Sequence, residues 1–400
     1  MTSPTPVRSA LTAAVAVLLL ALILRIPAIS LGPLLPVMRE DTGHGESFLS
    51  LLTAIPLALT LLVAPATPPV AARVGRSRLL GAALVGVVLG TGIRSVPGDV
   101  FLLAGTTVLG VSIAIGTVLA PAAISAEPRD RRAMLTAVYS TGLSLGPALA
   151  LGLTVPMMLG TGTGWRGALM LWALVAVVAL IVWSVYAGTT RADRGATAVP
   201  EPPSAGRAIG ARSVLGDPRA WLLAVYLGIT SLTFYTTSTW LPATLVLDRT
   251  DPAAAGAVAS LVNVVAIPFA MVAPVLMRRG FSPLLAPLAP AIAASGLGVL
   301  LLTASSGAIV AALLLGVSQG LCLGIAYGQI VQFATSPAHA GSVSAVTSAV
   351  GIALAAIGPL AFGVALETTG RWEVPVTGLG TILVVHLLVG LRTGRLGQNR

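Results

Sequence analysis

Long apolar runs follow one another along most of the chain and restrict the folds that it can adopt. Hydrophobic residues make up 56% of its 400 residues and charged residues only 9%, whereas soluble domains carry about 25% charged residues. A helix that crosses a bilayer needs about 20 predominantly apolar residues. The sequence therefore predicts an all-α integral membrane protein. About twelve spans are expected, at 10–37, 47–71, 79–96, 100–124, 133–158, 166–187, 220–245, 253–277, 283–304, 307–332, 341–366 and 373–391.

The charged and nucleophilic residues exclude several classes of function. The net charge is +10, but all 23 basic residues are arginines in short clusters between apolar runs, a pattern that encodes membrane topology rather than nucleic-acid binding. Without lysine there is no Walker-type phosphate lysine and no Schiff base. Cys322 is alone, so no disulfide is possible, and the three histidines lack metal-ligand spacing. We expect no cofactor, no metal and no enzymatic activity, with the lipid bilayer and a small solute as partners.

Arginine also predicts the orientation of the chain. With the N-terminus in the cytoplasm, inner segments hold 17 arginines, and cytoplasmic loops are the ones enriched in basic residues. Outer segments hold five, which are Arg39, Arg94, Arg166, Arg249 and Arg371. We therefore expect a plasma-membrane protein with both termini cytoplasmic.

A polar stretch near the middle divides the spans into two sets of six. Residues 188–219 are rich in Arg, Pro, Gly and Ala and contain no run of spanning length, which predicts a cytoplasmic linker between bundles at 1–187 and 220–400. Short motifs recur in order in both halves: LGVS at 109–112 and 315–318, AIP at 54–56 and 266–268, and Gly-Pro at 146–147 and 358–359. Two such six-helix repeats predict the major facilitator architecture, in which solute binds near the bilayer midplane between the halves.

Arg25 is the one permanent charge well inside a predicted span. A charge at mid-span costs about 2.5–3.5 kcal/mol on insertion scales, and a guanidinium matches planar anions such as carboxylate. All thirteen acidic residues fall in predicted loops or helix ends, so a buried carboxylate for cation transport or proton relay is not expected. We predict that Arg25 binds an anionic or electronegative solute; the alternative is that it bonds backbone carbonyls and holds the helices together.

Other polar residues are candidates for contact with solute. Thr236 and Trp240 share a face of the seventh predicted helix, which also carries Tyr235, while Asn263 and Gln319 offer amides on the eighth and tenth. Hydroxyl and amide groups also join membrane helices to one another, so packing is the competing interpretation.

Small residues and prolines predict helix contacts and bends. Gly142 and Gly146 are spaced for close helix approach, and Gly358 repeats Gly146 in the second half. Pro147 and Pro359 are expected to kink their helices.

Several stretches resemble the cyanate permease/nitroimidazole transporter (CynX/NimT-type) family of the major facilitator superfamily. They are LRIPAISLGPLLPVMRED, LLTAIPLAL, YSTGLSLGPALA, GWRGALMLWAL and SLTFYTTSTWLPATLV. The resemblance implies a transporter that works by alternating access, with Arg73, Gly75, Arg76 and Arg78 in a cytoplasmic gating loop. Ala72 stands where the superfamily usually has Asp.

The expected function is transport of a small anionic or polar planar solute, such as cyanate or a related compound, by a protein that we expect to be a monomer. The alternative is a multidrug-type or nitroimidazole-like exporter of the same fold in which Arg25 is structural. The direction of transport and any coupling ion stay open at this point.

Overall fold

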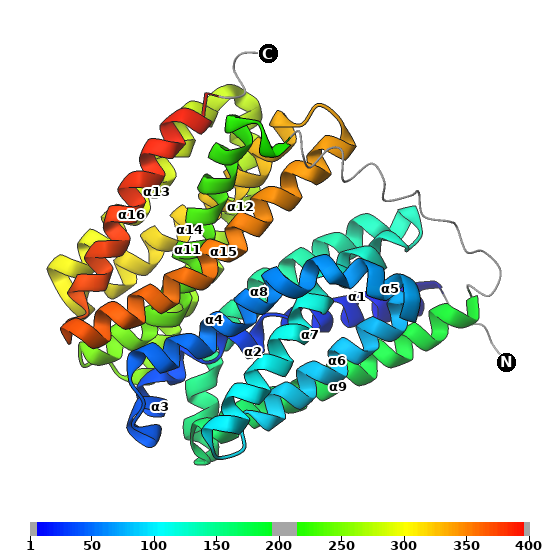
Figure 1. Ribbon diagram of the computed structural model, residues 1–400, viewed down its shortest axis with the longest axis horizontal. Helices are drawn as coiled ribbons and strands as arrows, with labels where there is room; N and C mark the ends of the chain where they lie inside the picture. The colour runs from blue at the N-terminus through cyan, green and yellow to red at the C-terminus, as the bar shows by residue number, and fades with distance from the viewer. Residues whose placement is uncertain (1–5, 194–213, 396–400) are drawn as a thin grey trace. The chain divides into compact units, whose positions relative to one another are not determined.

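The computed structural model describes residues 6–193 and 214–395, and all regular secondary structure in these ranges is helical (Figure 1). The middle of the predicted linker, 194–213, lies outside the described residues. The first half contains α1 (Pro6–Ile23), α2 (Ile26–Ile29), α3 (Leu35–Thr42), α4 (Glu46–Val63), α5 (Thr67–Val74), α6 (Arg76–Ile93), α7 (Asp99–Ser125), α8 (Arg129–Thr161) and α9 (Gly164–Asp193). The second half contains α11 (Pro218–Leu247), α12 (Pro252–Leu276), α13 (Ser282–Thr303), α14 (Ala308–Phe333), α15 (Pro337–Thr369) and α16 (Glu373–Thr393).

The predicted spans correspond to these helices. Ten segments of the described chain are long and apolar enough to cross a membrane, and one of them, Pro252–Phe333, contains α12, α13 and α14. Separating those three gives the twelve predicted spans, so the fold class is confirmed. Spans agree this well because a bilayer helix must satisfy its own backbone hydrogen bonds, which makes length and hydropathy decisive.

The first two spans differ from the prediction of continuous helices. The span predicted at 10–37 contains α1, α2, a 3₁₀ turn at Gly32–Leu34 and the start of α3. Pro27 has no N–H to donate, and its ring disfavours a regular helix across this point. The second span is likewise divided into α4 and α5 by a 3₁₀ turn at Ala64–Ala66, which contains Pro65.

Contacts group the chain into two units, residues 1–34 with 55–200, and residues 35–54 with 201–400. The first unit buries a core between α1, α6, α7, α8 and α9 that includes Leu20, Leu84 and Trp183. The second buries a core among α11, α13 and α14 that includes Tyr226 and Ile325. The predicted division at 1–187, 188–219 and 220–400 stays a prediction, because 35–54 belongs to the first half in sequence and packs in the second unit.

A carboxylate explains part of the packing of 35–54 in the second unit. Glu367, in the last turn of α15, accepts a hydrogen bond from the backbone N–H of Ser47 at 2.7 Å. Ser47 lies in the first turn of α4, where N–H groups have no partner within the helix and a negative charge is favourable. The side chain of Glu46 in the same turn pairs with Arg39 at 2.9 Å.

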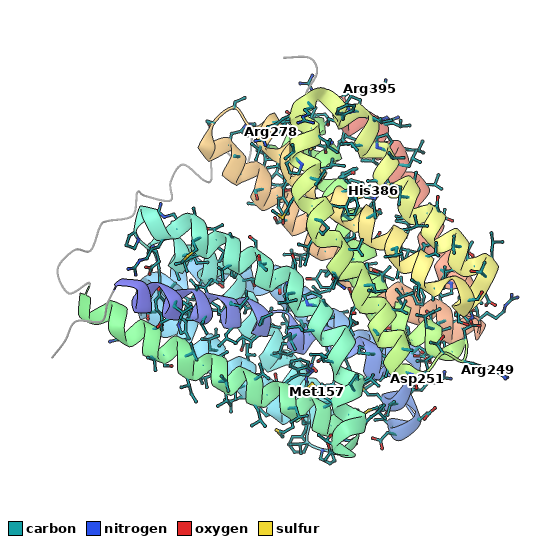
Figure 2. All side chains as sticks on the ribbon, turned by 180° about the vertical axis from the view of Figure 1, so that it is seen from behind. Met157, Arg249, Asp251, Arg278, His386 and Arg395 are labelled. Carbon is teal, nitrogen blue, oxygen red and sulfur yellow. The ribbon has the colours of Figure 1, made fainter. Side chains whose placement is uncertain are left out.

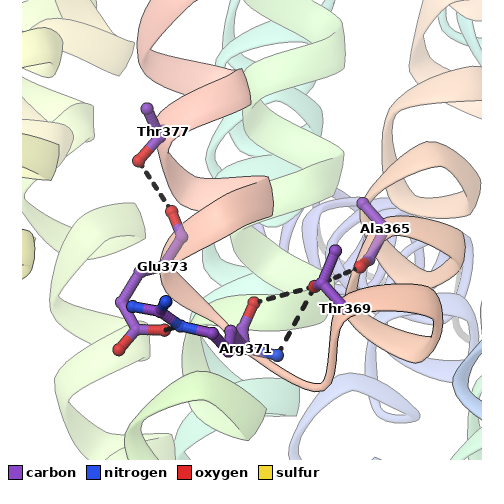
Figure 3. A network of polar contacts seen from close by, with 5 residues as sticks. All are labelled: Ala365, Thr369, Arg371, Glu373 and Thr377. Atoms are coloured by element: carbon purple, nitrogen blue, oxygen red, sulfur yellow. Dashed lines mark hydrogen bonds and ion pairs between the residues drawn. The ribbon is translucent and has the colours of Figure 1, made fainter.

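The connection between α15 and α16 is a compact polar turn (Figure 3). Gly370 ends α15 in the left-handed region with φ of 66°, a conformation that glycine adopts without strain. Thr369 donates to Ala365 O at 2.6 Å, and Arg371 Nε lies 3.6 Å from Glu373 Oε2. These bonds fix the turn between two antiparallel spans.

The outer surface of the helices is strongly apolar. Leu302 is 87% exposed, and Met271 and Val331 are each 72% exposed. In water such side chains would be unfavourable, but lipid tails solvate them. Their exposure therefore agrees with a protein surrounded by a bilayer.

Candidate functional site

Arg25 lies where the first span is broken. It is the N-cap of α2, with φ of −118° and ψ of −46°, and its N–H donates to Leu22 O at 3.0 Å, a bond to the third preceding residue rather than the fourth. Its side chain is half-buried. The break therefore places Arg25 in a non-helical segment inside the span. The sequence predicted the charge inside the span but not the break.

Helix α8 packs against α1 beside Arg25. A Cβ built on Gly146 would lie 3.0 Å from Arg25 Cβ, and one built on Gly142 would lie 2.6 Å from Ala21 Cβ. Tyr139, one turn before Gly142, is 8% exposed and belongs to the same buried core as α1. The two glycines thus bring α8 against the face of α1 that leads to Arg25.

A second arginine at this break was not identified from the sequence. Arg94 follows α6 and was expected in an outer loop, but its side chain is completely buried. Its Nη2 donates to Pro27 O at 2.5 Å and lies 3.4 Å from Ser30 Oγ. The one available signal was that Arg94 falls within the predicted span 79–96.

Acidic residues lie at the ends of helices, as predicted. Asp99 and Glu373 are in first turns, and Asp217 and Asp251 are N-caps of α11 and α12. Glu127, between α7 and α8, accepts a hydrogen bond from Tyr186 at 2.6 Å. No described carboxylate lies within the middle of a span, so the fixed charges deep in the first unit are positive.

Thr236 and Trp240 lie at a contact between α11 and α15. Trp240 is 1% exposed, donates from Nε1 to Pro359 O at 2.9 Å and stacks on Phe362 at 5.3 Å. Thr236 is 2% exposed, and its hydroxyl packs against Gly358 of α15. Sequence spacing placed them on one face of the helix but could not tell which neighbour that face contacts, and their contact with solute stays a prediction.

The remaining candidates of the second unit lie on three different helices. Tyr235 is half-buried on α11 with its ring edge against Phe234 at 4.9 Å. Gln319 is half-buried on α14, and Asn263 is 6% exposed on α12. Partial exposure makes Tyr235 and Gln319 more accessible than Thr236 and Trp240, and their contact with solute stays a prediction.

The predicted kink residues lie at helix contacts. Pro147 is buried next to Gly146 in α8. A Cβ on Gly358 would lie 2.9 Å from Leu232 Cγ, so α15 meets α11 closely just before Pro359. In each unit, therefore, a glycine-proline pair lies where two helices are in close contact.

The predicted gating loop connects α5 and α6. Arg73, Arg76 and Arg78 are exposed. Gly75 has φ of 95°, a conformation that residues with a Cβ rarely adopt. The glycine is therefore required for the turn, and a gating role for the arginines stays a prediction.

His386 is buried in the second unit, within the helices seen in Figure 2. It is 1% exposed and meets the ring of Tyr226 edge-on at 4.4 Å. The Tyr226 hydroxyl donates to Ala286 O at 3.1 Å and lies 3.8 Å from Cys322 Sγ. These contacts join α11, α13, α14 and α16, and Cys322 lies in the core of the second unit.

The sequence profile of the Major Facilitator Superfamily matches residues 14–359. The chain is 33% identical over 386 residues to the 2-nitroimidazole transporter of Escherichia coli (strain K12), covering 95% of this chain and 94% of that one. It is 27% identical over 349 residues to the cyanate transport protein CynX of the same organism, covering 86% and 87%.

Solved structures share the fold at low sequence identity. A bacterial homologue of the human lysosomal transporter Spinster superposes with a TM-score of 0.78 at 16% identity, covering 99% of this chain and 98% of that one. The D-xylose-proton symporter superposes with a TM-score of 0.70 at 14% identity, again covering 99% and 98%. The profile match and the two relatives confirm the expected resemblance. The chain is a multi-pass membrane transport protein of the major facilitator superfamily, related to the nitroimidazole and cyanate transporters.

Proposed function

We propose that this transporter moves a small anionic or polar planar solute and that Arg25 binds it. The observation that carries the proposal is the position of Arg25: a half-buried guanidinium at a helix break inside the first span. Non-helical backbone at membrane depth is tolerated where it is buried in protein or lines a cavity. An ionisable residue there is by default a candidate for function.

The chemistry of the surrounding residues supports an anion. Arg25 remains charged at any physiological pH and offers paired N–H groups to planar oxygen or nitrogen acceptors. The described carboxylates lie at helix ends, so they do not compete for this guanidinium from the middle of a span. Cyanate, which appears in the name of one relative, is a small anion that fits these donors.

A second candidate is export of a neutral nitro-heterocycle, with Arg25 structural. The observation that favours it is the higher identity and longer match to the 2-nitroimidazole transporter. The close approach of α8 to α1 at Arg25 is compatible with a structural role, because contacts of this kind fix both helices.

Flux into proteoliposomes separates these candidates. Labelled cyanate and 2-nitroimidazole would be compared in wild type, Arg25→Ala, Arg25→Lys and the exposed-site control Arg371→Ala. A hydrogen bond to a charged group contributes about 1.5–3 kcal/mol, so Arg25→Ala is expected to lower cyanate flux by about 10- to 100-fold. We expect Arg25→Lys to keep part of the flux and Arg371→Ala to keep all of it.

The result that contradicts anion binding is unchanged cyanate flux in a folded Arg25→Ala protein. Loss of both solutes together, with normal folding, would instead support a structural role for Arg25. Circular dichroism and gel filtration of each purified variant provide the folding control.

We also propose that both termini lie in the cytoplasm of a bacterial cell, with the protein in its plasma membrane. The excess of arginine in alternate connections supports this orientation. A reporter enzyme that is active only in the periplasm, fused after residue 400, is expected to be inactive; activity would reverse the proposed orientation.

A further inference from the structure

Arg94 is a buried cation that has no role in the proposed function. It directly follows α6, and its side chain has no exposed surface. Arginine keeps its proton at neutral pH in proteins, so the buried side chain carries a positive charge. A charge in this position is unfavourable unless something compensates it.

One compensating contact is the carbonyl of Pro27. This carbonyl belongs to the short helix α2, which ends at Ile29, and the last carbonyls of a helix have no partner within it. Arg94 Nη2 supplies a donor at 2.5 Å, and Ser30 Oγ supplies a weaker one at 3.3 Å. Arg94 therefore holds the backbone two residues after Arg25.

The rest of the guanidinium has no partner in the described part of the chain. Arg94 Nε and Nη1 are buried without a hydrogen bond, and none of the ion pairs between described residues includes Arg94. A neutral amide could donate to one carbonyl at lower desolvation cost. The hydrogen bond to Pro27 O thus accounts for a donor at position 94, but it does not account for a positively charged one.

We propose that Arg94 is a positioning residue for Arg25 and the second positive charge of the same anion site. Its bond to Pro27 O fixes the break that presents Arg25, and its charge raises the positive potential there, so that the site favours monoanions over neutral solutes of similar shape. Because the surroundings are buried, this potential is screened little by salt. The inference rests on the proposed function and names the charge class of the solute.

The two parts of this role can be separated by substitution. Arg94→Gln removes the charge and leaves an amide donor two bonds nearer the backbone than Nη2, whereas Arg94→Lys keeps the charge and one donor at nearly the full length of the side chain. The control is Arg371→Gln, which removes an arginine whose side chain is 71% exposed. Full-length proteins in proteoliposomes would be assayed for KM and kcat with cyanate at slightly alkaline pH and with 2-nitroimidazole at mildly acid pH, where its ring keeps the proton.

We expect Arg94→Gln to raise the KM for cyanate about tenfold, which corresponds to about 1.4 kcal/mol, and to change the KM for 2-nitroimidazole much less, because that solute is neutral at the assay pH. Arg94→Lys is expected to keep the KM for cyanate within about threefold because the charge is retained. A merely structural role would alter transport of both solutes alike. Equal effects on both solutes, or no effect of Arg94→Gln on either, would overturn the inference.

The same assay distinguishes this inference from the proposed function. If Arg25→Ala leaves cyanate transport unchanged, the proposed function and the role of Arg94 are both refuted. If Arg25→Ala abolishes cyanate transport while Arg94→Gln behaves as wild type, only the role of Arg94 is refuted. Should Arg94→Gln fail to fold, Arg94→Lys decides alone: a folded Arg94→Lys protein that loses cyanate affinity more than tenfold, while keeping 2-nitroimidazole transport, contradicts a role based on charge.

Discussion

Gly142→Ala tests the contact between α8 and α1 that lies one turn from the Arg25 contact. The added methyl carbon would lie 2.6 Å from Ala21 Cβ, 3.2 Å from Leu18 O and 3.3 Å from Leu18 Cδ1. Two non-bonded carbon atoms are most stable at about 3.5–4.0 Å. Ala21 Cβ is attached directly to the backbone and cannot rotate away, so the two helices must separate by about 1 Å.

The expected cost follows from overpacking. Extra methyl groups in a packed interior destabilise by about 1–3 kcal/mol. Alanine also gains up to about 1 kcal/mol of helix propensity over glycine, which would mask part of the cost. Gly81→Ala supplies the control, because Gly81 is within α6 and has nothing within 4 Å of a built Cβ. The difference between the two variants therefore isolates the packing cost.

Thermal unfolding in detergent measures this difference. We expect Gly142→Ala to melt about 2–8 °C below Gly81→Ala and to transport less cyanate, since α1 leads into the break at Arg25. Gly81→Ala is expected to match or exceed wild type. A Gly142→Ala protein that is as stable as Gly81→Ala would refute the close approach of α8 to α1.

Two further substitutions test contacts in the second unit. Trp240→Phe removes the indole donor to Pro359 O, a carbonyl inside α15 that keeps its place in the helix, so we expect the net loss of one hydrogen bond, about 0.5–1.5 kcal/mol; the more exposed Trp221→Phe should have a smaller effect, and equal melting temperatures would count against the Trp240 contact. Glu367→Gln removes a negative charge from the N-terminus of α4 beside Ser47, so we expect a small decrease in melting temperature that shrinks as salt is added; a decrease independent of salt would argue against a charge effect.

The sequence by itself determined the spans. Span 283–304 was predicted, and α13 runs from Ser282 to Thr303; the later spans agree to within several residues, whereas the first two are broken into shorter helices. This works because the bilayer imposes a local rule: each crossing segment needs enough apolar residues and must satisfy its own backbone. Arg25 could be identified as a candidate for the same reason, because a charged side chain inside such an apolar run is energetically unfavourable.

Other features were decided only by tertiary structure. Arg94 is an outer-segment arginine by sequence, and only the packing of α6 shows that it contacts Pro27 O. Likewise, only the packing of α11 on α15 shows that Trp240 donates to Pro359 O. The cap on α4 comes from Glu367, which is 320 positions away in sequence. Periodicity gives the face on which a side chain lies, but the partner of that face depends on which helices pack together. Hydropathy therefore fixed which segments cross the membrane, while the contacts among helices decided which polar side chains hold the fold and which remain accessible to a solute.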